Sequence, residues 1–291
     1  MKESDTLRRF MFEKFNIRGA FVHLDATWRA PLDLKDYPEV VRDQLGQCMA
    51  AGALLSSTIK YNGSMIMQIQ SEGPLKLLVV ESTGDHTMRS TAKWDGDVTP
   101  GNLEHVFGKG RVVFTVDSET AKDRYQGIID LKGENVAETL ETYFRQSEQL
   151  ETRFWLAANG KSAAGFLIQK MPGSGDDDQE AWNRAQILSA TLTDKELLGL
   201  SAEEILKRLY VEDEIRLFES EPLSFRCSCT RERVSNVLRS LGIDEVHKII
   251  EEEGDVSVTC EYCNQKYSFD SVDAEALFAS HVPPNTSATK H

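Results

Sequence analysis

Four of the five cysteines in this 291-residue chain lie within its last 65 residues, in two close pairs. One residue separates Cys227 from Cys229, two separate Cys260 from Cys263, and 30 residues lie between the pairs. Two such pairs can surround one ion with four thiolates, and a closed set of four cysteines is typical of structural zinc sites. Iron–sulfur clusters also take four cysteines, but ligand number and spacing favour zinc. We therefore predict one Zn²⁺ per chain, bound by Cys227, Cys229, Cys260 and Cys263.

The segment around the second pair indicates how its sulfurs are held together. Residues 258–269 (VTCEYCNQKYSF) have alternating side chains on both sides of a short turn, which predicts a hairpin with both sulfurs directed to one spot. Two amphipathic helices are expected between the pairs, one from Val234, Val237, Leu238 and Leu241 and one from Val246, Ile249 and Ile250. About 65 residues bury too little apolar surface to fold robustly alone, so a bound metal would supply the missing stability.

The spacing of the first pair leaves two roles open for this site. Most four-cysteine zinc sites only hold a fold together. However, two thiolates separated by one residue can also oxidise to a small, strained disulfide ring. Four nearby basic residues would favour thiolate over thiol, or would merely offset the charge of a zinc tetrathiolate: Arg226, Arg231, Arg233 and Lys266. Spacing alone does not decide between a structural and a redox-active site.

Charge is spread unevenly and divides the chain into three parts. The formal net charge is −14, of which residues 1–173 carry −2, residues 174–226 carry −7 and residues 227–291 carry −5. So acidic a chain has no general attraction to nucleic acid or to an anionic membrane. No apolar run approaches the ~18–20 residues of a membrane span, and the first residues lack the apolar core of a signal peptide. We expect a cytoplasmic protein without nucleic-acid or membrane partners.

Residues 1–173 have the pattern of an α+β domain. Apolar residues have helical spacing at Leu7, Phe10, Met11 and Phe15, across 41–55 and across 136–146. Strand-like segments are expected at 20–24, 65–69, 75–80, 111–116, 153–156 and 165–170. Because the strands come in runs with helices between the runs, an α+β fold is favoured over a doubly wound parallel sheet.

Residues 174–226 are expected to form a helical linker. Residues 173–178 (GSGDDD) have the composition of a loop, after which Ala185, Leu188 and Leu192 share one helical face. Ser201 and Glu204 have the spacing of a capping box that begins another helix. These helices are short and only modestly apolar, so they should depend on packing against a neighbour.

The sequence contains no complete motif of a nucleotide-binding or hydrolytic enzyme. Asn159-Gly160-Lys161-Ser162 resembles the end of a phosphate loop, but Trp155 stands where the motif needs glycine, so a hairpin turn is expected. The six histidines are dispersed without ligand spacing. Cys48 lies in the apolar stripe of the helix predicted over 41–55, where a buried free thiol is expected. We therefore expect a protein that is not an enzyme.

Around its cysteines the sequence resembles a known family. Residues 225–229 (FRCSC), 231–234 (RERV) and 258–263 (VTCEYC) are similar to the HslO family of redox-regulated heat-shock chaperones, the 33-kDa chaperonins. The same resemblance extends upstream to residues 53–57 (ALLSS), 125–129 (YQGII), 143–149 (YFRQSEQ) and 167–172 (LIQKMP). It covers essentially the whole chain except the tail after about residue 279.

This resemblance implies an ATP-independent holdase that is inactive while reduced and zinc-bound. It implies an N-terminal α+β domain (1–173), a helical linker (174–226) and a small C-terminal zinc domain (227–291), in agreement with the charge division. It also implies that oxidants convert the ligands into two disulfides, Cys227–Cys229 and Cys260–Cys263, with zinc release and loss of structure in the C-terminal domain and linker. The oxidised protein would then bind unfolding or oxidatively damaged client proteins under oxidative or heat stress, commonly as a homodimer.

Two other functions compete with this interpretation. A zinc-ribbon interaction module that binds nucleic acid would need a basic stripe near the metal, whereas residues 227–291 are net acidic. A zinc-binding thiol–disulfide oxidoreductase would need its CxxC at a helix N-terminus within a βαβ unit, whereas Cys260 and Cys263 lie in a predicted hairpin. The redox chaperone accounts for the metal ligands, their close pairing and the marginal linker together.

Overall fold

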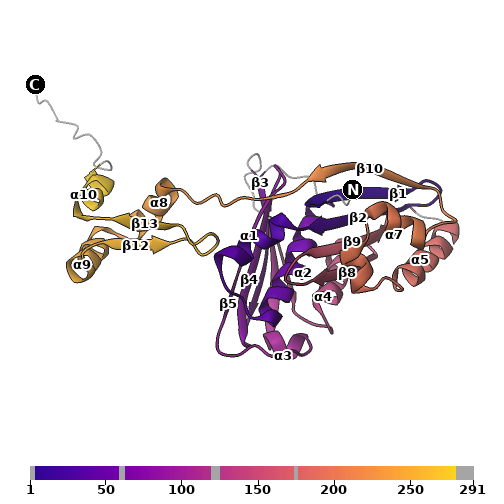
Figure 1. Ribbon diagram of the computed structural model, residues 1–291, viewed down its shortest axis with the longest axis horizontal. Coiled ribbons are helices and arrows are strands. Elements are labelled where there is room, and N and C mark those ends of the chain that lie inside the picture. The colour runs from indigo at the N-terminus through magenta and orange to yellow at the C-terminus, as the bar shows by residue number, and fades with distance from the viewer. Residues whose placement is uncertain (1–3, 59–62, 119–124, 174–175, 280–291) are drawn as a thin grey trace, which may run out of the picture. The chain divides into compact units, whose positions relative to one another are not determined.

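The computed structural model describes residues 4–58, 63–118, 125–173 and 176–279. The chain forms two compact units, Met1–Arg226 and Cys227–His291 (Figure 1). The first unit contains two β-sheets with helices, and the second is a small mixture of helices and one hairpin. The predicted α+β class is confirmed, and the division into three domains stays a prediction. No helix in the described part of the chain is long and apolar enough to cross a membrane.

The first unit is built on two predominantly antiparallel sheets. The five-stranded sheet has the order β10 (Ile215–Pro222), β1 (Thr6–Phe12), β2 (Ile17–Leu24), β9 (Ala163–Lys170) and β8 (Thr152–Ala158). The six-stranded sheet has the order β11 (Ser224–Phe225), β5 (Thr87–Trp94), β4 (Leu75–Thr83), β3 (Gly63–Ser71), β6 (Gly110–Ser118) and β7 (Tyr125–Asp130). Every pair of neighbours is antiparallel except β11 and β5. All six predicted strand segments lie within these strands.

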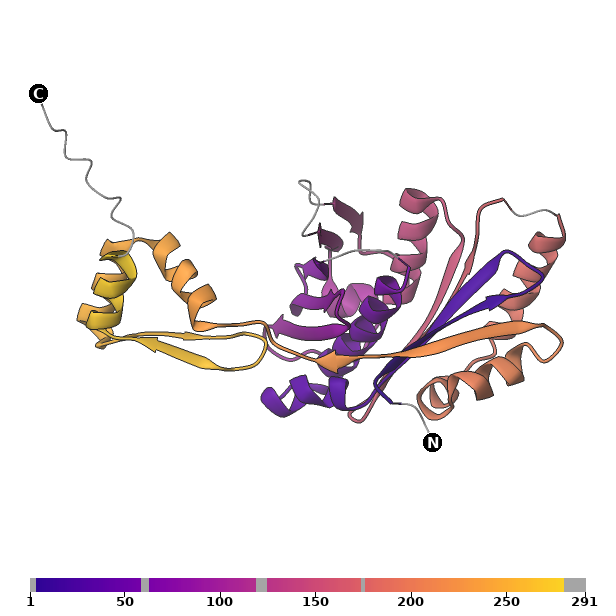
Figure 2. The same ribbon diagram turned by 90° about the horizontal axis from the view of Figure 1, so that it is seen from above.

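Helix α2 (Glu39–Ser56) packs against strands of both sheets (Figure 2). Eleven of its 18 residues are buried. The buried residues occupy most sides of the helix because an apolar sheet packs against it on each side. This confirms the helix predicted over 41–55. Three further helices complete the same core: α1 (Ala26–Leu34), α3 (Leu103–Phe107) and α4 (Val136–Tyr143), the last continued by the single π-helical turn Phe144–Glu148.

The other face of the five-stranded sheet is covered by three short helices, α5 (Asp176–Ser189), α6 (Asp194–Gly199) and α7 (Ala202–Leu209). We call this face the aromatic face, and it consists of Phe10, Phe12, Ile17, Phe21, Phe166 and Ile168. The helices bury Trp182, Ile205 and Leu209 against it. Ser201 and Glu204 form the predicted capping box. The helices therefore have the packing neighbour that their composition requires.

Two segments differ from the sequence-based expectation. The apolar residues at 7–15 were predicted to be helical, but Leu7, Phe10 and Met11 lie in strand β1 and Phe15 lies in the loop after it. The strand alternates normally, so Leu7 joins the core around α2, whereas Phe10 and Phe12 face the other side and belong to the aromatic face. The linker, predicted to be helical throughout, ends in β10, which pairs with β1. None of the side chains of edge strand β10 is fully buried and three of its eight residues are charged, so it lacks the apolar alternation that would have predicted it.

The second unit has the order α8 (Arg231–Leu241), α9 (Ile243–Glu253), β12 (Val256–Thr259), β13 (Lys266–Phe269) and α10 (Ser271–Ala279). Both predicted helices are present, although Val237 and Leu241 on α8 are exposed. The core is small and consists of Val234, Leu238, Val246, Val256, Phe269, Ala274 and Leu277. Seven buried side chains stabilise such a unit weakly.

Candidate metal centre

The four clustered cysteines come from two short loops of the second unit. Cys227 and Cys229 lie in the segment between β11 and α8, directly before Thr230. The hydroxyl of Thr230 accepts a hydrogen bond from the backbone N–H of Arg233 at 3.1 Å and caps the N-terminus of α8. The first pair therefore lies directly before the capped N-terminus of α8.

Cys260 and Cys263 lie in the turn that joins β12 to β13. The backbone N–H of Cys260 donates to the carbonyl of Gln265 at 3.0 Å, and the N–H of Asn264 donates to the carbonyl of Cys260 at 2.9 Å. Asn264 adopts a left-handed conformation with φ 54°, which asparagine tolerates better than most residues. The hairpin predicted from the sequence is confirmed, and its tight turn brings both sulfurs to the same side.

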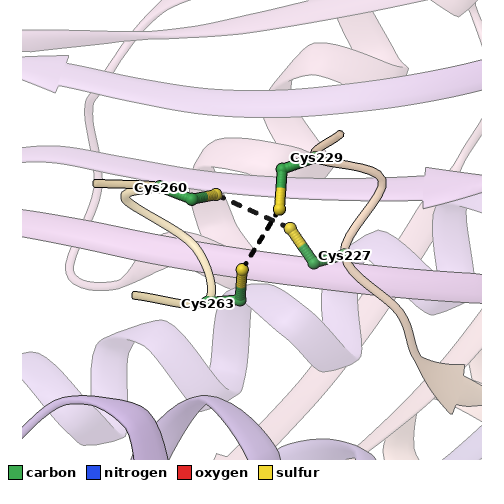
Figure 3. A group of neighbouring side chains, drawn as sticks. All are labelled: Cys227, Cys229, Cys260 and Cys263. Carbon is green, nitrogen blue, oxygen red and sulfur yellow. Dashed lines mark hydrogen bonds between the residues drawn. The ribbon is translucent and has the colours of Figure 1, made fainter. Parts of the chain in front are cut away.

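The four sulfur atoms face one another across a single small space (Figure 3). All four lie within 4.8 Å of one another. Cys229 and Cys263 are separated by 3.3 Å between sulfurs, and Cys227 and Cys260 by 3.6 Å. A disulfide bond requires ~2.05 Å, whereas a tetrahedral ion with metal–sulfur bonds of ~2.3 Å places its ligands about 3.8 Å apart. The four cysteines form no disulfide, and their spacing fits a four-sulfur metal site.

Electrostatics in this cluster oppose four bare thiolates. Burial raises the pKa of Cys263 far above its ordinary value, and hydrogen bonding with the neighbouring cysteines raises it further. The hydroxyl of Tyr267 donates to the sulfur of Cys229 at 3.3 Å, and this bond raises the pKa of Tyr267 to about 12. Four thiolates this close therefore need a cation among them, which is the charge balance of a metal site.

Tyr267 is a contact that sequence reasoning missed, although its place on the strand directly after the cysteine turn was a usable signal. Two of the four basic residues expected around the sulfurs, Arg231 and Arg233, make other contacts. Arg233 donates to the carbonyl of Ser228 at 2.8 Å, and Arg231 pairs with Asp273 at 2.7 Å. The Arg231 guanidinium also lies 4.1 Å from the centre of the Phe269 ring. These arginines stabilise the loops that carry the cysteines.

The fifth cysteine lies apart from this cluster. Cys48 is fully buried in α2, and burial raises the pKa of its thiol well above the ordinary value. The prediction of a buried free thiol is confirmed. The sequence 159–162 is the turn between β8 and β9, closed by a hydrogen bond from the Asn159 N–H to the Ser162 carbonyl at 2.9 Å. It is a hairpin turn, as predicted.

Comparison with known proteins gives a consistent result over the whole chain. The Hsp33 protein family model matches residues 5–270. The 33 kDa chaperonin of Nitrosococcus oceani is 48% identical over 291 residues, which is 100% of both chains, and that of Methylobacillus flagellatus is 45% identical over 284 residues, which is 97% of both. The crystal structure of the 33 kDa chaperonin from Thermotoga maritima has the same fold, with a TM-score of 0.83, 21% identity and coverage of 95% of this chain and 98% of that one.

Proposed function

This chain belongs to the Hsp33 family, and from that premise we propose that it is a redox-regulated, ATP-independent holdase. It binds unfolding proteins under oxidative or heat stress and prevents their aggregation. The observation that carries this proposal is the cluster of four free thiols, which lies in a small unit with a weak core. A reaction at those thiols can change the stability of the unit, because little else stabilises it.

In the reduced state one Zn²⁺ is held by Cys227, Cys229, Cys260 and Cys263. Zinc is favoured because four thiolates in a closed, tetrahedral arrangement are its typical structural ligands. When bound, it neutralises thiolate charge and links the two loops. Structural zinc contributes ~10–16 kcal/mol of apparent binding free energy in small peptides. This exceeds any plausible stability of a unit with seven buried side chains.

Activation consists of oxidation of the four thiolates to two disulfides, Cys227–Cys229 and Cys260–Cys263. Each disulfide forms with loss of two electrons, so two equivalents of a peroxide or hypohalous acid balance the reaction, each accepting two electrons and being reduced to water or to halide and water. The product sulfurs are poor ligands, and oxidation therefore releases the metal. In the reduced state the sulfurs of Cys227 and Cys260 lie 3.6 Å apart and those of Cys229 and Cys263 lie 3.3 Å apart, so both contacts between the loops are replaced when each pair closes within itself.

Unfolding of the second unit is proposed to release the linker helices α5–α7. These helices cover the aromatic face of the first unit. Once they detach, Phe10, Phe12 and Phe166 become accessible, together with the apolar sides of the helices. This exposed surface is the proposed site for clients in the oxidised protein, which acts in the cytoplasm as a homodimer.

The test measures light scattering of a thermally unfolding client with reduced and with oxidised protein, while released zinc is quantified in parallel. Suppression of scattering by the oxidised form alone, with about one zinc released per chain, supports the proposal. Equal suppression by both forms, or activation without metal release, contradicts it.

The two competing functions have less support. Cys260 and Cys263 lie in a hairpin turn, without the helix N-terminus that activates the thiol of a typical oxidoreductase. Residues 227–291 carry a net charge of −5, which opposes the phosphate contacts of a nucleic-acid-binding zinc ribbon.

A further inference from the structure

Three of the four outer strands of the two large sheets are protected against pairing with another chain. Strand β10 carries charges and a terminal proline, as shown by Arg216, Glu219, Glu221 and Pro222. On β8, the N–H of Phe154 donates to the carboxylate of Glu141 at 3.0 Å, and α4 packs against the strand. Strand β11 has only two residues. Charges, proline, side-chain capping and short length are the usual devices that protect a sheet edge.

Strand β7 is less protected, although Tyr143 of α4 lies against its Gly127. It pairs with β6 over all six of its residues, and among the described residues no strand pairs with its other side. Its sequence, YQGIID, contains no proline and no lysine, and its only charge is at the last residue, Asp130. Its outer backbone N–H and C=O groups therefore face outward, available to a further strand.

The exposed fractions of side chains along one row of the six-stranded sheet show that the β7 edge lacks a neighbouring strand. Val79, Gln68, Val113 and Ile128 are successive partners across β4, β3, β6 and β7. Val79 is 8% exposed and Val113 is 9% exposed, whereas Ile128 is 56% exposed. Ile128 has a neighbouring strand on one side only, so a strand added outside β7 would bury it as Val113 is buried.

We propose that the outer edge of β7 binds an extended, uncharged, apolar-rich segment of an unfolded polypeptide, which adds to the sheet as a seventh strand. This inference rests on the proposed chaperone function, since a holdase must accept many sequences. Edge pairing recognises the backbone, which every unfolded chain offers, and side chains such as Ile128 add apolar contact. Because β7 carries one charged residue, Asp130, it offers little charge to pair with a charged segment, and a neutral segment is favoured.

This contact does not depend on the redox switch, because the edge is open while the cysteines are free. A single edge of six residues binds weakly. It gains importance when the same client also binds the aromatic face after oxidation. Two weak contacts made by one client give a higher overall affinity than either contact alone. The edge therefore contributes to client retention in the oxidised state.

The experiment compares two full-length variants that place lysine at equally exposed apolar positions. Ile128→Lys places a charge on the β7 edge, which disfavours pairing with a further strand. Val237→Lys places the same charge on α8, and Val237 is 56% exposed, as is Ile128. We expect Ile128→Lys to weaken binding of a fluorescently labelled unfolded protein to the oxidised chain by on the order of fivefold, with Val237→Lys unchanged. Equal affinity of the Ile128→Lys and wild-type proteins would overturn the inference.

Hydrogen exchange on the wild-type protein gives an independent measurement. Amides of residues 125–130 should gain protection when the unfolded protein binds. Gained protection without suppression of aggregation would support the edge contact and contradict the proposed holdase function. Suppression of aggregation with unchanged exchange in β7 would do the reverse. Finally, an Ile128→benzoylphenylalanine variant should photocrosslink to the unfolded protein, and crosslinking only to a second copy of this chain would overturn the choice of partner.

Discussion

The carboxylate of Asp178, in the first turn of α5, accepts a hydrogen bond from the backbone N–H of Asn16 at 2.8 Å and another from its side-chain amide at 3.0 Å. Asp178 is largely buried, and Asn16 lies in the loop between β1 and β2. This pair joins the start of the linker to the sheet that the linker covers. Loss of these two hydrogen bonds is therefore expected to weaken the attachment of α5 to the sheet.

Asp178→Ala should loosen α5 without oxidation. The substitution removes the acceptor and leaves both Asn16 donors without it, which typically costs about 1–3 kcal/mol. We expect faster hydrogen exchange in α5 and partial suppression of client aggregation by the reduced, zinc-bound variant. Glu180→Ala is the matched control, because Glu180 is an exposed carboxylate on the same helix. An Asp178→Ala variant with unchanged exchange would show that this pair does not hold the linker.

The second unit should depend on its metal for folding. Cys260→Ser combined with Cys263→Ser removes two of the four sulfurs, so we expect loss of zinc and of protection in α8 and α9. Elemental analysis should give about one zinc per chain for the reduced wild type and almost none for the variant. The first unit should keep its own unfolding transition, since its cores are separate. Full zinc retention by the variant would refute the ligand assignment.

Cys48 should be dispensable for redox switching. Its thiol is fully buried and its pKa is raised, so little of the reactive thiolate forms. Cys48→Ala should cost about 1 kcal/mol or less through a small cavity, and oxidative activation should remain. Alkylation should label Cys48 only after the chain is denatured. A folded Cys48→Ala variant that oxidant cannot activate would show that this residue takes part in the switch.

Oxidation should release the linker while the sheets stay intact. Hydrogen exchange is expected to show loss of protection across residues 180–210, where the short helices α5–α7 pack on the aromatic face. Strands β3 and β6 should remain protected in the same sample, because both are central in the six-stranded sheet. Unchanged linker protection after complete zinc release would refute the coupling between the metal and the linker.

Much of the cysteine site could be predicted because its information is local. The paired spacing identified the four sulfurs as a candidate metal cluster, and the alternation around Cys260 and Cys263 identified the hairpin. The contact between Tyr267 and Cys229 was not foreseen, because it depends on how the two loops meet.

The errors in the fold have a common physical cause, which is pairing between distant segments. Strand β1 is covered on both faces, so its apolar residues Leu7, Phe10 and Phe12 are divided between two cores and their combined spacing resembles that of a helix. Strand β10 is stabilised by β1, about 210 residues earlier in the chain, and none of its own side chains is fully buried. The sequence of such a strand gives little indication of its structure, because its hydrogen bonds are made with a strand that is distant in the sequence.

The pairing of β1 with β10 also determines the order in which the chain can fold during synthesis. Domains generally fold as they leave the ribosome, N-terminal part first. Here the five-stranded sheet that contains residues 6–12 is complete only after residues 215–222 have been synthesised. Until α5–α7 have emerged, the aromatic face of the growing first unit has no cover. The nascent chain thus passes through a stage that displays the same apolar surface proposed for the activated protein, and it needs protection of its own at that stage.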